Sequence, residues 1–228
     1  MKWRELVEAN RAYRRGAPLG DLAVIKFAAL TRDDPAFTAR MQEVAGYHPT
    51  VELDALRRLP VGSLGRAYAA FLDGNGITPL VVSPAIKARY QADPYPLRYS
   101  ATHDLHHVLT GFDATIAGEI GVFAFTIGQR HPIVRRPFLW FVLLLSALLL
   151  PLQQRRLWHN ARVGLRMGAA ARLLVAARLE DQLARPLAEA REDLQIPDPV
   201  AAGVLPGRRS WLAAALFPKP ALTAEKPA

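Results

Sequence analysis

The sequence predicts an all-α protein: a single-domain helical bundle with a metal site and an irregular, proline-rich C-terminal tail. Three observations lead to this fold class. Helix start and stop signals recur along the chain, as at Asp34-Pro35 and Ser83-Pro84, where a capping side chain precedes a proline that fits the first helical turn. Sustained alternation of apolar and polar residues, which indicates half-buried strands, is lacking. The 228 residues suffice to bury one sizeable core.

Two helices joined at Gly111 are expected to hold the chemistry. If Ser100 to Thr110 is helical, His103 and His107 lie one turn apart and project from the same face. One straight helix would carry Glu119 about 18 Å from His107. Gly111 suits a helix C-cap, Phe112 supplies the hydrophobic contact, and Asp113 suits the N-cap of a second helix ending near Gly128. This turn returns Glu119 to the histidines.

The longest apolar run, Pro137 to Leu152, is expected to form the next helix. Its 16 residues fall short of the ~20 needed to span a bilayer. Arg135-Arg136 and Arg155-Arg156 flank it, so it is expected to be a core helix, a helix that lies against a membrane, or a wall of a lipid-binding tunnel. Pro151 predicts a bend or an end.

Residues 153–185 have the periodicity of one long helix, within which Gly164-x-x-x-Gly168 would allow close packing. From Pro197 onward six prolines exclude regular helix over much of the chain. We therefore expect a helical domain over residues 1–196 and a proline-rich tail over 197–228. In this tail, Trp211 to Phe217 is a short apolar piece that could dock on the body or touch membrane.

Composition narrows the partners and the location. The net charge is +9, with only five lysines, but the arginines are spread along the chain and no nucleic-acid-binding motif is legible. We therefore expect no nucleic acid and favour an anionic membrane surface. Met1 to Arg15 has no apolar segment of the kind that signal peptides carry. The expected location is cytoplasmic, peripheral to the inner (cytoplasmic) membrane.

His103, Asp104, His107 and Glu119 are the candidate metal ligands and catalytic residues. With no cysteine in the chain, a metal must bind nitrogen and oxygen, and this set suits zinc, with iron or manganese as alternatives. Asp104 could serve as a third ligand or orient an imidazole. Glu119 stands among apolar residues, where a carboxylate without a partner would be costly. Arg98 and Tyr99 are the candidate substrate-binding or supporting residues.

The run His103-Asp104-Leu105-His106-His107, followed after eleven residues by Glu119, resembles the HDxxH-x11-E zinc motif of the coenzyme Q (ubiquinone) biosynthesis protein family Coq4. The similarity extends over roughly residues 64–199. It includes Leu64-Gly65-Arg66-Ala67-Tyr68 with Phe71, Asn75 and Pro79, then Arg98-Tyr99, residues 107–111, Leu179-Glu180 and residues 187–199. Two departures stand out. His106 replaces an expected aromatic residue, and the residues directly before Glu180, Arg178-Leu179, do not include the expected tryptophan.

The resemblance implies an all-helical protein of ubiquinone biosynthesis. The activity it implies is metal-dependent C1 decarboxylation of a polyprenylated hydroxybenzoate, a lyase reaction. It also implies a role in organising other ubiquinone biosynthesis enzymes. The polyprenylated aromatic precursor needs an apolar tunnel. We expect the helices after the motif to enclose this tunnel, to form a homodimer interface, or both.

Two alternatives stay open. A non-catalytic scaffold could bind prenyl lipids and use the metal for structure. An HD-type metal phosphohydrolase would fit adjacent His103-Asp104, but it needs a further histidine and aspartate. His48, His131 and His159 offer no convincing set. Metalloprotease chemistry is disfavoured because Asp104 stands beside the first histidine and is too short for the base of an HExxH site.

Overall fold

The computed structural model describes residues 3–132 and 136–208, which form helices and loops without a β-strand. This confirms the all-α fold class. The first helices are α1 (Trp3–Arg14), α2 (Leu19–Leu30), α3 (Pro35–Arg40), α4 (Leu53–Arg57), α5 (Leu64–Asn75) and α6 (Pro84–Arg89). They are followed by α7 (Tyr95–Thr110), α8 (Ile116–Gly128), α9 (Arg136–Leu149), α10 (Gln154–Ala170), α11 (Leu187–Asp193) and α12 (Pro199–Ala202). Four 3-10 turns, η1 (Gln42–Val44), η2 (Pro151–Gln153), η3 (Leu174–Ala176) and η4 (Leu179–Gln182), complete the order.

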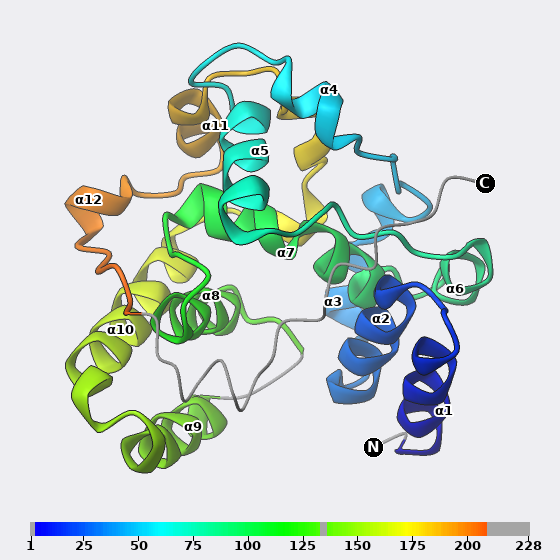
Figure 1. The fold of residues 1–228 in the computed structure, drawn as a ribbon, viewed down its shortest axis with the longest axis horizontal. Helices are drawn as coiled ribbons and strands as arrows, with labels where there is room; N and C mark the ends of the chain where they lie inside the picture. The colour runs from blue at the N-terminus through cyan, green and yellow to red at the C-terminus, as the bar shows by residue number, and fades with distance from the viewer. Residues whose placement is uncertain (1–2, 133–135, 209–228) are drawn as a thin grey trace.

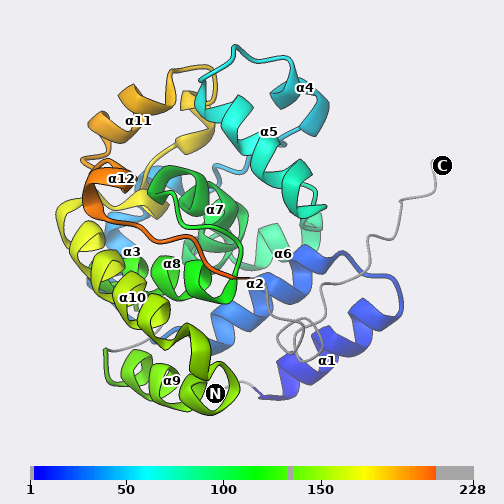
Figure 2. The same cartoon turned by 60° about the vertical axis from the view of Figure 1, so that its left-hand side comes forward.

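Helix α7 lies in the middle of the molecule (Figure 1). The views in Figures 1 and 2 place α5 and α11 on one side of it, α8 and α10 on another, and the pair α1–α2 on a third. Thirteen of its 16 residues are buried. The remaining three are Ala101, His103 and Asp104, so α7 reaches solvent mainly where the motif begins.

Local capping explains where the helices begin and end. Asp34, Ser63 and Ser83 each accept a hydrogen bond from the backbone N–H three residues later and so cap the starts of α3, α5 and α6. This confirms the starts predicted at Asp34-Pro35 and Ser83-Pro84. Gly111 ends α7 in the left-handed region, with φ of 74°. Helix α8 is capped by Thr115 instead of Asp113. The Asp113 carboxylate accepts a hydrogen bond from the Thr115 N–H at 3.0 Å and so supports the cap from one step further out.

Helices α8 and α10 pack with their backbones almost in contact. A Cβ atom added at Gly164 would overlap the Gly121 carbonyl oxygen, and one added at Gly168 would overlap the Phe125 carbonyl oxygen. The Gly164-x-x-x-Gly168 pair thus serves helix–helix packing, as small residues do elsewhere.

The predicted long helix over residues 153–185 is wrong beyond Ala170. Helix α10 ends there because Ala171 takes an extended conformation, and the Arg172 N–H bonds to the Leu194 carbonyl at 2.9 Å. Of the apolar residues that continued the pattern, Val175 and Leu179 are buried in the core, where they belong to the 3-10 turns η3 and η4. The helix-like spacing of apolar residues in this segment reflects their burial in the core and not a helix.

Helix α9 buries one face and exposes the other. Leu139 and Leu143 are fully buried, whereas Phe141, Leu144 and Leu148 are 59%, 69% and 80% exposed. The helix ends just before Pro151, as predicted. Across the described ranges, no helix is both long and apolar enough to span a membrane.

The start of the predicted tail lies along α10. The Asn160 side chain donates to the Leu205 carbonyl at 2.9 Å and accepts from its N–H at 3.0 Å. The Gly207 N–H donates to Asp113 at 2.7 Å. The short helix α12 interrupts the irregular chain. The apolar piece Trp211 to Phe217 lies outside the described residues.

We predict that Gly168→Ala lowers the free energy of unfolding by about 1–3 kcal/mol, because the new methyl group would force α8 and α10 apart. Chemical denaturation measures this. Gly74→Ala is the matched control, since Gly74 also lies in a helix but has open space at the Cβ position. The control should be neutral or stabilising by up to about 1 kcal/mol. Equal effects at both positions would contradict the packing account.

Candidate metal centre

The turn at Gly111 brings Glu119 of α8 against the two histidines of α7. The Glu119 carboxylate lies 3.3 Å from His103 Nε2 and 3.4 Å from His107 Nε2. The two imidazole Nε2 atoms are 3.4 Å apart. These three side chains form the group that could hold one metal ion, so the expectation that Glu119 folds back onto His107 is confirmed.

The spacing of the three donor atoms fits a shared ion. Zinc binds nitrogen and oxygen at about 2.0–2.1 Å in tetrahedral geometry, which separates neighbouring donors by about 3.3–3.4 Å. The observed separations are 3.3, 3.4 and 3.4 Å. Three corners of a tetrahedron are thus in place, and three protein ligands with an open fourth position are the pattern of catalytic zinc sites.

The hydrogen bonding of His107 points its free nitrogen into the site. His107 Nδ1 lies 3.0 Å from the Phe112 carbonyl oxygen, which only an N–H can satisfy, so Nε2 is the nitrogen that can take up a proton or a metal ion. This Nε2 atom faces the Glu119 carboxylate and His103 Nε2. Acceptors that converge in this way need a proton or a cation between them. A carbonyl partner of this kind is also the usual support of a metal-binding histidine.

Electrostatics in the site favour a positive charge. Burial is the largest single influence on His103 and would lower its pKa, but the hydrogen bond to Glu119 and the charges of Glu119 and Asp104 together raise that pKa above its ordinary value. Burial would likewise raise the pKa of Glu119, but hydrogen bonds to His103 and His107 hold it well below its usual range. The carboxylate is therefore ionised and available as a ligand.

Asp104 and His106 do not belong to the group of three converging ligands. Asp104 is half-buried. Burial is the main reason that the pKa of Tyr68 on α5 is raised, and the charge of Asp104 adds to it; the same charge adds to the effect of Glu119 in raising the pKa of His103. The fully buried His106 has its Nδ1 2.7 Å from the Thr102 carbonyl and its ring near Tyr99 and Phe125. His48, His131 and His159 also lie outside this group of three ligands. Among the described residues the group therefore lacks the further histidine that an HD-type phosphohydrolase would need.

Tyr99 lies beside the centre, whereas Arg98 contacts the segment that follows α10; both side chains are buried. The Arg98 guanidinium is fully buried and forms a two-pronged ion pair with Glu180, at 2.7 and 3.1 Å, while also donating to the Ala177 carbonyl. The Tyr99 ring packs edge-on against His103 with centroids 5.6 Å apart. On α5, Phe71 stacks on His107 at 5.3 Å. The ring contacts of Tyr99 with His103 and of Phe71 with His107 hold the two imidazoles in their orientations.

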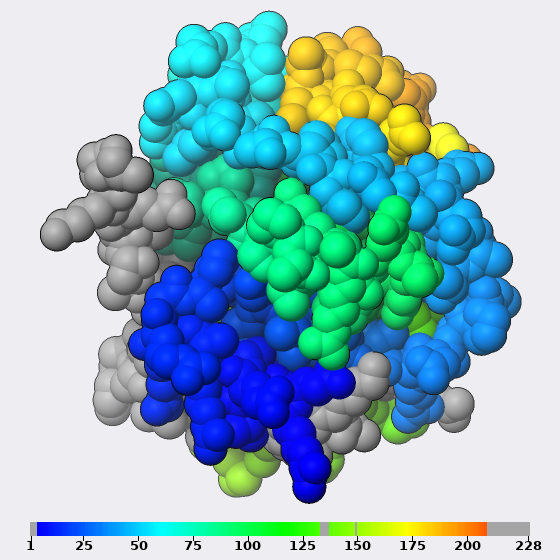
Figure 3. Space-filling view, turned by 90° about the vertical axis from the view of Figure 1, so that its right-hand side faces the viewer, coloured from blue at the N-terminus to red at the C-terminus, as the bar shows by residue number. Residues whose placement is uncertain are grey.

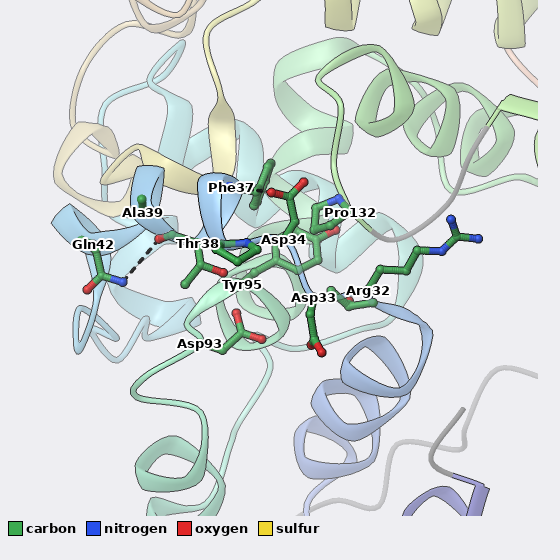
Figure 4. A pocket seen from close by; sticks show the side chains of 12 residues that line it. Arg32, Asp33, Asp34, Phe37, Thr38, Ala39, Gln42, Asp93, Tyr95 and Pro132 are labelled. Carbon is green, nitrogen blue, oxygen red and sulfur yellow. Dashed lines mark hydrogen bonds between the residues drawn. The ribbon is translucent and has the colours of Figure 1, made fainter.

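A pocket of about 490 Å³ lies elsewhere, at the α2–α3 junction (Figure 4). Asp33, Asp34 and Asp93 stand around it, and Phe37 and Tyr95 form an aromatic wall. Neither the three converging ligands nor any residue of α8 or α9 lines it. It is therefore distinct from the tunnel that was expected to open toward the metal.

An all-helical fold whose central helix–turn–helix presents two imidazoles and one carboxylate defines a protein with a candidate nitrogen- and oxygen-ligated metal centre. Residues 47–200 match the family described as coenzyme Q (ubiquinone) biosynthesis protein Coq4. This match covers well over half of the residues of the chain, so the chain belongs to the Coq4 family.

Individual relatives agree with this assignment. The chain is 30% identical over 172 residues to the mitochondrial ubiquinone biosynthesis protein COQ4 of Uncinocarpus reesii, covering 75% of this chain and 57% of that protein. The chain is 28% identical to the protein of the same name in Yarrowia lipolytica, covering 75% of this chain and 61% of that protein. The chain thus spans little more than half of these relatives. A crystal structure of a protein described as a ubiquinone biosynthesis protein from Nostoc punctiforme is 28% identical, with a TM-score of 0.56, covering 78% of this chain and 82% of that one.

Sequence reasoning missed Lys26 on α2. This exposed lysine is close enough to His103 for its charge to oppose protonation of the imidazole. No motif marks it, but one signal exists in the sequence. Lys26 is the single charged residue in the apolar stretch Leu22 to Leu30, where a lone charge indicates a face that is not packed.

We predict that His107→Ala and Glu119→Gln each abolish metal retention, because each removes one of three converging donors. Metal content per chain after dialysis against a weak chelator, read by elemental analysis, checks this. His106→Phe is the matched control because it keeps an aromatic ring in the buried site and leaves the donors intact. Full metal retention in His107→Ala would rule out the centre as described.

Proposed function

We propose that this protein acts in ubiquinone biosynthesis by metal-dependent C1 decarboxylation of a polyprenylated hydroxybenzoate. The observation that supports this most directly is the set of three donors spaced for one ion at the partly exposed edge of α7. Membership of the Coq4 family adds the pathway. The side chain of His103 is 25% exposed and that of Glu119 is 49% exposed, so a substrate head group can approach them.

In this proposal His103, His107 and Glu119 hold zinc, or alternatively iron or manganese, and Asp104 contributes negative charge beside them. A bound divalent ion supplies Lewis-acid polarisation of a head-group oxygen. The protein's own residues orient the ligands: the Phe112 carbonyl fixes the tautomer of His107, and Phe71 covers its ring.

Tyr99 and Arg98 take supporting roles. The Tyr99 ring forms a wall beside His103, and the Arg98–Glu180 pair anchors the start of α7 to η4. The reaction breaks the bond between C1 and the carboxylate, leaves the electron pair on the ring carbon, and replaces carbon dioxide by one proton. Oxidative loss of the carboxylate would additionally consume oxygen, because zinc has no redox chemistry.

We further propose that α9 attaches the protein to a membrane. Its outward row of large apolar side chains, Phe138, Phe141, Leu144, Leu145 and Leu148, continues to Leu152, and exposed Arg155 follows. An apolar stripe flanked by arginine suits the interface of an anionic bilayer. This position, on the cytoplasmic face of the inner membrane, would give access to prenylated precursors and to other enzymes of the pathway.

The same exposed row supports a second candidate function, a non-catalytic scaffold that presents prenyl lipids to partner enzymes. In a scaffold the metal would be structural. The row could also be covered by a second copy of the chain in a homodimer.

The zinc-loaded protein should release carbon dioxide and a ring-decarboxylated product from a short-chain prenylated 4-hydroxybenzoate. His107→Ala should lose at least about 100-fold in rate, since the ligands act as one unit, and His106→Phe should retain activity. Mass spectrometry of the product, with and without oxygen, distinguishes simple from oxidative loss. Substrate binding without carbon dioxide release under either condition would leave the scaffold.

Leu144→Ser/Leu148→Ser should reduce binding to anionic liposomes by at least about tenfold, because each exposed leucine loses about 1.5–3 kcal/mol of burial in lipid. Flotation at low salt measures this, and high salt should weaken binding through screening. Val61→Ser, at a valine that is 92% exposed on another part of the surface, is the control. If the α9 variant changes the sedimentation coefficient but not flotation, α9 is instead a dimer interface.

A further inference from the structure

The three metal ligands come from two helices that are held by different parts of the molecule. His103 and His107 lie on α7, which is packed in the middle of the body, whereas Glu119 lies in the first turn of α8. Helix α8 packs most extensively on α10, where the glycines of α10 admit its backbone. The distance between Glu119 and the imidazoles therefore depends on how the α8–α10 pair is held against α7.

Arg191 of α11 caps the end of α7. Its half-buried guanidinium donates from Nε to the Leu109 carbonyl at 2.9 Å and from Nη2 to the Val108 carbonyl at 3.1 Å. The last carbonyls of a helix have no partner within that helix, and a positive charge beside them is favourable. Arg191 therefore fixes the last turn of α7 just before the chain reverses at Gly111.

Two further contacts hold the α7–α8 turn itself. Buried Pro199 lies so close to Gly111 that a Cβ atom added at Gly111 would overlap the proline ring. Gly207 lies against Thr115, where an added Cβ atom would overlap the hydroxyl group. The Gly207 N–H also donates to the Asp113 carboxylate at 2.7 Å. Both ends of the turn are thus covered by the C-terminal part of the described chain.

The contact at Thr115 is transmitted to Glu119 through the first turn of α8. The Thr115 hydroxyl accepts a hydrogen bond from the Gly118 N–H at 3.3 Å. The Thr115 carbonyl accepts one from the Glu119 N–H at 2.8 Å. A displacement of Thr115 therefore displaces the backbone of Glu119, whose carboxylate oxygen must lie about 2.0–2.2 Å from a zinc ion to bind it.

The same segment is tied to α10. His159 Nε2 lies 2.7 Å from the Gly203 carbonyl oxygen, and Asn160 holds both backbone groups of Leu205. Figure 1 shows the segment, in orange, running from α12 to α10. It lies on the side away from the face in Figure 3, to which α1, α2 and α6 contribute. Since α2 supports α7 from that other side, the C-terminal segment completes the support of the two ligand helices.

We propose that residues 191–207 form a clamp on the α7–α8 turn that positions Glu119 against His107, so that the metal affinity of the centre depends on Arg191 and Gly207. Neither of these two residues belongs to the three converging ligands, and both act through the helices that carry them. The family match ends at residue 200, so the contact made by Gly207 comes from a part of the chain outside it. This positioning role rests on the metal centre that the proposed function uses, and not on decarboxylation.

The test measures the zinc Kd of the full chain by competition with a chromophoric chelator. Arg191→Met keeps the apolar stem and removes both donated hydrogen bonds. It should raise the Kd about 10- to 100-fold, as expected for a residue that supports metal ligands without touching the ion. Arg191→Lys should recover part of the affinity, because an ammonium reaches a carbonyl but lacks the planar fork. Arg185→Met is the matched control, since this exposed arginine pairs with carboxylates of α11, and it should bind zinc as wild type does.

Gly207→Ala tests the other end of the clamp. The added methyl group would overlap Thr115 and push the segment off the turn, so the zinc Kd should rise by about tenfold or more. Gly74→Ala, at a helical glycine with open space at the Cβ position, should leave the Kd unchanged. The free energy of unfolding of each metal-free variant is measured in parallel, because a residue with only a structural role would lower it without changing the zinc affinity of the folded chain.

Wild-type zinc affinity in either Arg191→Met or Gly207→Ala, with or without a loss of stability, would overturn the clamp and leave the decarboxylase proposal unaffected. Weaker zinc binding in both variants, with both controls unchanged, would support it. If zinc affinity depends on the clamp but zinc-loaded wild type releases no carbon dioxide from a prenylated substrate, the clamp stands and decarboxylation fails. If wild type binds no zinc, the metal centre and the clamp are overturned together.

Discussion

The structure depends on burying α7, a helix with an unusual number of polar side chains for the centre of a protein. Arg98, Thr102, His106 and Thr110 are all fully buried, and a buried polar group without a partner costs several kcal/mol. The helix itself supplies most partners. The Thr102 and Thr110 hydroxyls donate to carbonyls one turn earlier, at 2.8 and 2.6 Å. Only the Arg98 charge requires a distant partner, and Glu180 of η4 provides it.

That requirement connects the metal centre to the chain that follows α10. To reach Arg98, residues 171–185 must leave the helical path and cross the body as loops and 3-10 turns. Breaking a buried pair by removing one partner strands the other charge and is strongly destabilising. The Arg98–Glu180 pair therefore holds the first turn of α7 in place. Because His103 and His107 lie on the same helix, their positions depend on this anchor.

Local signals in the sequence predicted the centre well. Helical spacing placed His103 and His107 on one face, and the Gly111 turn returned Glu119, because both effects act over a few residues. Interactions between distant segments were not accessible. The periodicity that suggested a helix up to residue 185 included Val175 and Leu179, which are buried in 3-10 turns and not in a helix. The approach of Lys26 to His103 depends on how α2 packs, which no spacing rule contains.

The two departures from the family pattern are explained by their surroundings. Burial lowers the pKa of His106 to about 3, so its ring stays neutral and packs near Tyr99 and Phe125 as an aromatic residue would. Its Nδ1 hydrogen bonds to the Thr102 carbonyl, which turns the ring away from the ligands. Before Glu180, where a tryptophan was expected, Arg178 instead lies over the Tyr47 ring at 4.8 Å. Tyr47 also faces the Arg98 guanidinium at 5.3 Å. One aromatic ring, Tyr47, thus packs against both guanidinium groups and links the residues before Glu180 to the Arg98–Glu180 pair that positions α7.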